Sequence, residues 1–258
     1  MTELAVYQYL LIGLIFIWSG FVRSGLGFGG AVLSLPFLLL VHDEPLVFLP
    51  IISVHLLVFS SLTIAMNNRH AVAGGGAESV STVDWAYLRR ILPIMIVPKL
   101  VGVVGLITLP GGVLSAIIFV IVSVYSLTYI FNRPFRSRSP FVDVLFLVVG
   151  AYISGTSLIG APLIIAVMAQ HVAREKLRDT LLALWFIMVG IKLVAFIWAG
   201  VDLQLVHHLW LLPCAAVGHV IGLRAHNKML QAETPTFFRI VGAVLLTVSV
   251  LGMWQSLA

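Results

Sequence analysis

The chain has 258 residues, of which 60% are hydrophobic and only 10% are charged. Soluble domains have about a quarter charged residues and fewer than half apolar ones. A chain this apolar lacks the polar side chains to cover a surface in water, which excludes a soluble globular enzyme. The apolar residues fall in blocks of roughly 18 to 22, the length of a helix that crosses a bilayer core of about 30 Å. The composition therefore predicts an all-α polytopic membrane protein.

The apolar blocks predict about ten helical segments, separated by Gly, Pro and charged residues. They span residues 5–22, 26–41, 45–66, 86–109, 113–131, 141–154, 158–170, 180–199, 204–222 and 236–257. The first two segments, and likewise the sixth and seventh, are either two full crossings or a re-entrant hairpin, which gives eight to ten spans. Arg23 is the first basic residue, so the chain lacks the basic start of a cleavable signal peptide, and the first block is expected to be a retained helix.

The charges in the loops predict the orientation of the chain. Basic loops alternate with loops that are acidic or neutral. The basic residues are Arg69, Arg133, Arg136, Arg138, Arg174, Lys176, Arg178, Arg224 and Lys228, and the acidic ones on the other side are Asp43, Glu44 and Asp202. Because basic loops stay in the cytoplasm, this alternation predicts a multi-pass protein of the cell membrane with both termini outside the cytoplasm. It also accounts for the net charge of +5 without a nucleic-acid partner.

Five segments on each side of the basic loop after residue 131 imply two halves of opposite orientation, an arrangement common among secondary transporters. The predicted organisation is a first half at 1–131, a basic cytoplasmic linker at 132–140 and a second half at 141–258.

A weak internal repeat agrees with two related halves. The stretch from Ser24 to Leu33 recurs 130 residues later from Ser154 to Leu163. The stretch from Leu92 to Gly102 recurs from Leu212 to Gly222. Apolar sequences easily match by chance, so the repeat supports two related halves only in combination with the charges of the loops.

Two glycine-rich motifs occupy equivalent positions in the two halves. The first glycine motif is SGLGFGGAVLSLP, Ser24–Pro36, and the second is SGTSLIGAPLII, Ser154–Ile165. Glycine and proline interrupt helices, and lipid tolerates an interruption only where protein or a wet cavity covers the freed backbone groups. From Ala31 to Val41 and from Ala161 to His171, the last residues before the next loops, there are 11 residues each, about 17 Å of helix, which places both motifs near the bilayer midplane.

The glycines of these motifs have two interpretations. One is close helix packing, for which membrane helices use small residues. The other is a substrate site, in which helices that begin at Gly29-Gly30 and at Gly160-Ala161 direct free amides toward an anion.

At these motifs the chain resembles the TauE/SafE sulfite exporter family. The resemblance rests on the glycine-rich motif that ends in Pro36, its shorter echo around Pro162 and the paired-half layout, and it covers essentially the whole chain. It implies a permease for sulfite, sulfonates and related small anions rather than an enzyme, with no cofactor and no metal. Phe28 and Ile159 depart from relatives whose glycines are more continuous, so the family name does not fix the substrate.

The ionisable residues within the predicted spans are all basic: Arg23, His55, Lys99, Lys192 and His219, the last at the repeat position of Lys99. Asp and Glu fall at segment ends or in loops. A buried lysine without a carboxylate costs several kcal/mol unless it deprotonates or meets an anion. The alternative is that these long side chains reach an interface or a wet cavity.

Other polar and aromatic residues have simpler expected positions. His207 and His208 are expected at a membrane interface, as are the tryptophans, and the motif hydroxyls bond either an oxyanion or their own helix backbone. The candidate substrate-binding residues are Arg23, Ser24, Gly25, Gly27, Gly29, Gly30, His55, Lys99, Ser154, Gly155, Thr156, Ser157, Gly160, Pro162, Lys192 and His219.

The predicted function is a secondary transporter of small anions, such as sulfite, organosulfonates or carboxylates, with alternating access at a midplane site between the two helix breaks. Its partners are the anion, the bilayer and a coupling ion, H⁺ or Na⁺. Three driving forces are left open for transport. They are a proton carried by His55 or His219, a bound sodium ion, and uncoupled movement of the anion down the membrane potential. An anion channel is the first alternative. An intramembrane serine hydrolase is disfavoured, because neither motif fits G-x-S-x-G. Nothing in the sequence indicates an oligomer.

Overall fold

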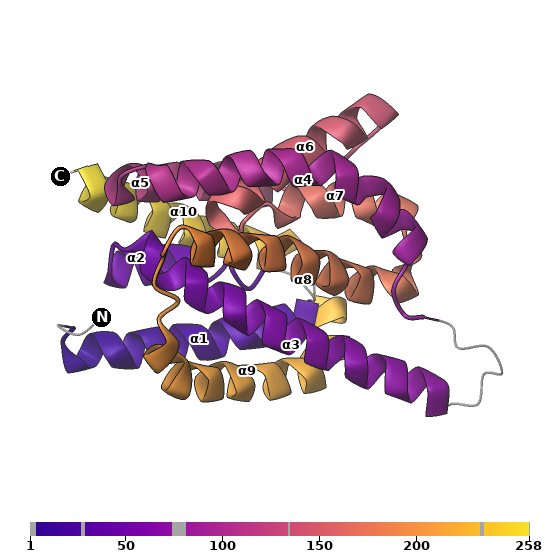
Figure 1. Ribbon diagram of the computed structural model, residues 1–258, viewed down its shortest axis with the longest axis horizontal. Helices are drawn as coiled ribbons and strands as arrows, with labels where there is room; N and C mark the ends of the chain where they lie inside the picture. Colours follow the sequence, from indigo (N-terminus) through magenta and orange to yellow (C-terminus); the bar gives the residue numbers. More distant parts are fainter. Residues whose placement is uncertain (1–3, 27–28, 74–80, 134, 233–234, 258) are drawn as a thin grey trace.

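The computed structural model describes residues 4–26, 29–73, 81–133, 135–232 and 235–257, and within these ranges it contains ten helices and no strand (Figure 1). The helices are α1 (Val6–Leu26), α2 (Leu35–Val41), α3 (Pro45–Ala73), α4 (Trp85–Thr108), α5 (Gly111–Ile130), α6 (Pro140–Ser157), α7 (Ala161–His171), α8 (Arg174–Trp198), α9 (Leu205–Ala232) and α10 (Pro235–Leu257). Each of the ten predicted segments has a counterpart.

Eight of the helices in the described part of the chain are long and apolar enough to cross a membrane, and the two others are the short helices α2 and α7. Large apolar side chains such as Val97, Val104, Ile197 and Leu209 are exposed on the outside of the bundle, where lipid would cover them. The chain is therefore a multi-pass helical membrane protein. The eight spans lie at the lower end of the predicted range.

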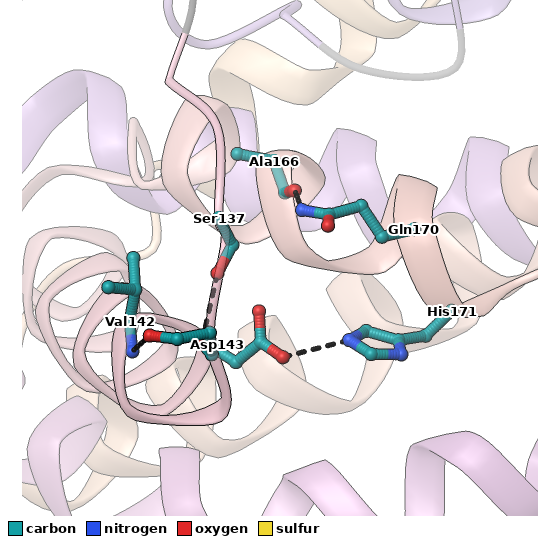
Figure 2. A network of polar contacts seen from close by, with 7 residues as sticks. Ser137, Val142, Asp143, Ala166, Gln170 and His171 are labelled. Carbon is teal, nitrogen blue, oxygen red and sulfur yellow. Dashed lines mark hydrogen bonds and ion pairs between the residues drawn. The ribbon is translucent and has the colours of Figure 1, made fainter.

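Each short helix returns to the end of the bundle at which its long partner begins. In the α1–α2 pair, Gln8 Nε2 donates a hydrogen bond of 2.9 Å to Val41 O. In the α6–α7 pair, His171 Nε2 lies 2.9 Å from Asp143 Oδ2 (Figure 2). The first turn of one helix thus contacts the last turn of the other in both pairs. Both predicted forms, two crossings or a re-entrant hairpin, return the chain to its starting side, and the structure shows this return in both pairs.

The contact between Asp143 and His171 joins three helix ends. Asp143 lies in the first turn of α6, where the helix dipole favours a negative charge, and His171 ends α7. Ser139 caps α6 by accepting a 3.3 Å hydrogen bond from Val142 N (Figure 2). The ring of Tyr87, in the first turn of α4, stacks on His171 at 5.7 Å. The starts of α4 and α6 and the end of α7 therefore share one end of the bundle.

The two ends of the bundle differ in their connections. Both chain termini lie at one end, together with the α8–α9 connection (Figure 1). The α7–α8 connection lies at the opposite end (Figure 1). Arg174 begins α8 directly after this connection, and the exposed Arg136 and Arg138 line a cavity together with Gln170 in the last turn of α7. This end is called the basic end below.

Some helix boundaries differ from the prediction. Helix α2 begins at Leu35 rather than at residue 26, because residues 30–34 form a turn that precedes Pro36. Helices α3, α8 and α9 are longer than their apolar blocks. Their extensions carry polar and charged residues such as Asn67 and Arg178, which propagate a helix beyond the hydrocarbon core. Apolar blocks therefore mark the spans but underestimate the helices.

The most extensive helix contacts join α1 to α9, α4 to α6, α5 to α10 and α3 to α8. Glycines permit two of these contacts. A Cβ added at Gly102 of α4 would lie 3.0 Å from Gly155 Cα in α6, and one added at Gly222 of α9 would lie 3.1 Å from Gly25 N in α1. The internal repeat relates Gly25 to Gly155 and Gly102 to Gly222, so both close contacts are made by repeat-related residues. Close packing, one of the two interpretations of the motifs, therefore describes Gly25 and Gly155.

Candidate functional site

The two glycine motifs meet around a cavity of about 30 Å³, called the inner cavity here, which has room for about two water molecules. Its walls come from the α1–α2 pair, the α6–α7 pair, α3 and α8. They comprise Ser19, Arg23, Gly29, Gly30, Ala31, Val32, Ile52, Leu56, Ser154, Leu158, Ala161, Trp185 and Val189. Sequence segments that are 130 residues apart thus share one cavity.

Among the described residues that line the inner cavity, Arg23 is the one cation. It lies in the last turn of α1, and its side chain is buried, with 7% exposed. Within the described residues its Nε and one terminal nitrogen, Nη2, have no hydrogen-bond partner, and its guanidinium carbon lies 4.6 Å from the centre of the Phe59 ring. A guanidinium with unpaired N–H donors at a cavity has the geometry that binds an oxyanion, because its planar fork matches two oxygens.

A lysine and a histidine hold the serines that open the two motifs. Lys99 Nζ donates hydrogen bonds to Ser154 O, at 2.9 Å, and to Ser154 Oγ, at 3.0 Å. His219 Nδ1 is hydrogen-bonded to Ser24 Oγ. Both serine hydroxyls therefore bond basic side chains of other helices. Ser154, to which Lys99 is hydrogen-bonded, lines the inner cavity.

Two other motif hydroxyls bond their own helix instead. Thr156 Oγ1 and Ser157 Oγ donate to Ile153 O at 3.0 and 2.9 Å. These contacts correspond to the backbone alternative that the sequence left open.

Lys192 and His55 are buried near the site but do not line the inner cavity. Neither Lys99 nor Lys192 has any exposed surface, so neither side chain reaches an interface. Lys192 Nζ has no hydrogen-bond partner among the described residues, and it lies 5.6 Å from the centre of the Phe196 ring. His55 packs against Phe16 and against His208, whose ring centre is 5.3 Å away. His208 lies in the first turn of α9, the end of the helix at which it was expected, and its side chain is buried against His55 of α3.

Two residues that the sequence analysis missed as part of this region complete the end of α1. Arg178 Nη2 donates a 2.6 Å hydrogen bond to Ser24 O, and His226 Nδ1 lies 2.5 Å from Gly25 O. The last carbonyls of a helix have no partner within it, and these side chains supply one. Arg178 belongs to the basic cluster of Arg174, Lys176 and Arg178, which was interpreted only as a signal of orientation. This cluster is the sequence signal that could have indicated a basic partner for the end of α1.

The predicted helix starts have different outcomes. Helix α7 begins at Ala161 with Gly160 as its N-cap, as predicted, and Ala161 lines the inner cavity. The predicted start at Gly29-Gly30 is wrong. Gly29 has a positive φ of 81°, and Leu33 N bonds Gly29 O at 2.8 Å in a turn before α2. Glycine adopts this φ without strain, which lets the chain turn here.

The remaining candidates lie elsewhere. Gly27 lies outside the described residues. Pro162 lines a different cavity, at the basic end. A Cβ added at Gly160 would lie 2.9 Å from Ser154 N, so Gly160 also permits close contact between α6 and α7.

No carboxylate is found among the described residues that line the inner cavity. Asp179 is buried near the start of α8, which begins at Arg174, earlier than its apolar block. Its Oδ1 accepts a 2.8 Å hydrogen bond from Asn67 Nδ2. In the part of the chain that is described, no group of three His, Cys, Asp or Glu is placed to hold a metal ion.

A bundle of apolar spans in which two broken helix pairs meet around a buried cationic cavity defines a membrane transport protein. The model of the sulfite exporter TauE/SafE family matches residues 11–253, nearly the whole chain, and the chain belongs to this family. It is an anion permease family whose members are transporters and not enzymes. No curated protein and no solved structure matches the chain.

Proposed function

We propose that this protein exports small oxyanions, such as sulfite, organosulfonates or small carboxylates, by alternating access at the inner cavity. One observation supports this most directly: Arg23, with unpaired N–H donors, shares the inner cavity with both glycine motifs. Transporters of inverted-repeat architecture bind substrate where discontinuous helices meet.

The charges around the inner cavity favour an anion. An anion about 4 Å from a cation gains roughly 4 kcal/mol at an effective dielectric constant of 20. Arg23 lines the inner cavity, and Lys99 is hydrogen-bonded to Ser154 in its wall. The N-terminus of α7, at Ala161, adds a positive dipole end. A neutral or cationic solute would gain none of this stabilisation.

The size of the inner cavity favours a carrier cycle over a permanent pore. A volume of about 30 Å³ holds water but leaves no continuous path of anion width. Its walls come from both five-helix parts of the chain, so movement of one part against the other would widen it toward one face at a time. In this proposal the basic end faces the cytoplasm and both termini lie outside, as the charges of the loops predict.

The membrane potential alone can drive export. An inside-negative potential expels an anion with about 2.3 kcal/mol per charge per 100 mV. A coupled cycle would use a proton on His55 or His219, or a sodium ion.

The test is flux into and out of proteoliposomes that contain the purified protein, with sulfite, sulfoacetate, thiosulfate and acetate as substrates. We expect saturable anion flux that falls at least about tenfold in Arg23→Gln, since one lost charge contact is worth more than 1.4 kcal/mol. Arg133→Gln is the matched control, because Arg133 is exposed and lies outside the inner cavity. Normal flux in folded Arg23→Gln would refute the site. Unitary conductance steps in planar bilayers would instead establish a channel.

A further inference from the structure

A second, larger cavity opens at the basic end of the bundle. Its volume is about 620 Å³, within the range of about 300 to 1,000 Å³ that small-molecule sites occupy. It lies between the end of α5, the linker that follows it, α7 and the start of α10. We call it the vestibule.

The walls of the vestibule combine cationic and apolar side chains. Arg136 and Arg138, both exposed, contribute guanidinium groups from the linker. Phe135, Ile165 and Phe238 contribute an apolar surface. Among the described residues that line the vestibule there is no carboxylate. A molecule with an acidic head group and a short carbon chain satisfies both kinds of wall, because arginine binds oxyanions through paired N–H donors and the apolar wall buries the chain.

A third, small cavity of about 20 Å³ lies between the vestibule and the inner cavity. It shares Tyr129, Pro162 and Phe238 with the vestibule. It shares Gly29 and Val32 with the inner cavity. The three cavities therefore form a series from the basic end to the glycine motifs.

The narrow part of this series is formed by Tyr129, Pro162 and Phe238, called the constriction below. Tyr129 lies near the end of α5, Phe238 near the start of α10 and Pro162 in the first turn of α7. The rings of Tyr129 and Phe238 lie with their centres 5.6 Å apart. Helices α5 and α10 pack closely here, since a Cβ added at Gly242 would lie 2.9 Å from Tyr129 Cβ. Access between the two larger cavities thus depends on how these rings are placed.

We propose that the vestibule binds small organic anions, sulfonates or carboxylates, through Arg136 and Arg138, and delivers them to the inner cavity through the constriction. This rests on the proposed function, because it supplies the route by which substrate reaches Arg23. It also narrows the substrate class to anions that carry a short apolar chain.

The charge of the vestibule is tested by thiol labelling, which needs no transport. Cys214 is the single cysteine, so Cys214→Ala provides a cysteine-free background into which Ala169→Cys, at an exposed position in the vestibule wall, is introduced. The probes are sulfonatoethyl methanethiosulfonate, an anion, and its trimethylammonium counterpart. We expect the ratio of anionic to cationic labelling rates to fall about threefold or more in Arg136→Gln/Arg138→Gln, because both local charges are lost.

Two controls define the result of this labelling. Arg133→Gln should leave the ratio unchanged, since Arg133 is exposed but does not line the vestibule. Butane-1-sulfonate should slow labelling more than sulfate does at equal ionic strength. An unchanged ratio in the double variant, or equal protection by the two anions, overturns the vestibule as an organic-anion site.

The constriction is tested with Val241→Cys, whose position lines the small middle cavity. In the same background we expect the anionic probe to label it slowly, and Phe238→Ala to raise the rate about tenfold or more by removing the ring between the cavities. Phe141→Ala, at an exposed phenylalanine outside the three cavities, is the control. Equal rates with and without Phe238 refute the constriction. If labelling behaves as expected while liposome flux is absent, the proposed function fails and the vestibule stands.

Discussion

Lys99 of α4 and His219 of α9 are each the fifteenth residue of their helix, and each is hydrogen-bonded to the serine that opens a glycine motif. The two helices start at opposite ends of the bundle, so the contacts lie at matching depths from opposite faces. Lysine can only donate, whereas a histidine nitrogen can donate or accept. The same position therefore carries different chemistry in the two parts of the chain.

The role of the lysine is tested by Lys99→Met, which keeps an unbranched side chain, one atom shorter, and removes its charge and both bonds to Ser154. We predict that initial sulfite flux in proteoliposomes falls at least about tenfold, because the anion loses a nearby cation. Thermal unfolding should be nearly unchanged, since a buried charge without a carboxylate partner stabilises little. Arg89→Met, at an exposed position of the same helix, is the control. Wild-type flux in Lys99→Met would disprove this role.

The close contact between α4 and α6 predicts different responses at two glycines of α4. In Gly102→Ala the added methyl group would lie against Tyr152 O and Gly155 Cα. We expect the free energy of unfolding to fall by about 1–3 kcal/mol, the usual cost of overpacking. In Gly105→Ala nothing lies within 4 Å of the new methyl group, so stability should rise by about 0.5–1 kcal/mol. Reversible unfolding in mixed detergent micelles measures both, and similar values for the two variants would contradict the packing.

The end of α1 predicts a structural role for Arg178. Arg178→Gln removes the hydrogen bond to Ser24 O, and we expect about 1.5–3 kcal/mol lower stability, as for other hydrogen bonds to charged groups. Proteolysis near the first glycine motif should also become faster. Arg174→Gln changes an exposed residue of the same cluster and should leave both unchanged. Equal effects of the two variants would show that only the cluster's net charge matters.

The orientation of the chain is tested with single cysteines in the Cys214→Ala background. Ser139→Cys and Asp202→Cys replace exposed residues in the linker and in the α8–α9 connection. An impermeant maleimide added to intact cells should label the cysteine at 202, and the one at 139 should react only after permeabilisation. Labelling of both from the same side would overturn the inverted arrangement of the two halves.

The sequence was sufficient for the spans and insufficient for the walls of the site. Apolar blocks and charged loops are local signals, and they placed all ten helices. The inward faces were not predictable, because a helix that is apolar on all sides does not reveal which side packs inward. Ile52 and Trp185 line the inner cavity, and for this reason neither was identified from the sequence.

The glycine motifs also combine features that local sequence predicts with features that only the tertiary structure decides. Their interruption of the helices was predicted, and so was the start of α7. The start of α2 was not, because both Gly29 and Pro36 are local breakers, and only the tertiary structure decides which one begins the helix. The basic partners of the motif serines, Lys99 and His219, come from α4 and α9, far away in sequence. Their depth within the predicted spans identified them as candidates, but it did not indicate which serine each would bind.

The pairing of α1 with α9 affects how the protein is made. The most extensive contacts of α1, α3, α4 and α5 are all with helices of the second half of the chain. Helices enter the membrane in the order of synthesis, so α1 remains in lipid without its main neighbour until α9 has been made. Gly20, whose position beside Ala215 of α9 leaves no room for a methyl group, then faces lipid. A message truncated before α9 should therefore yield inserted but unassembled helices, which the cell's membrane proteases would remove.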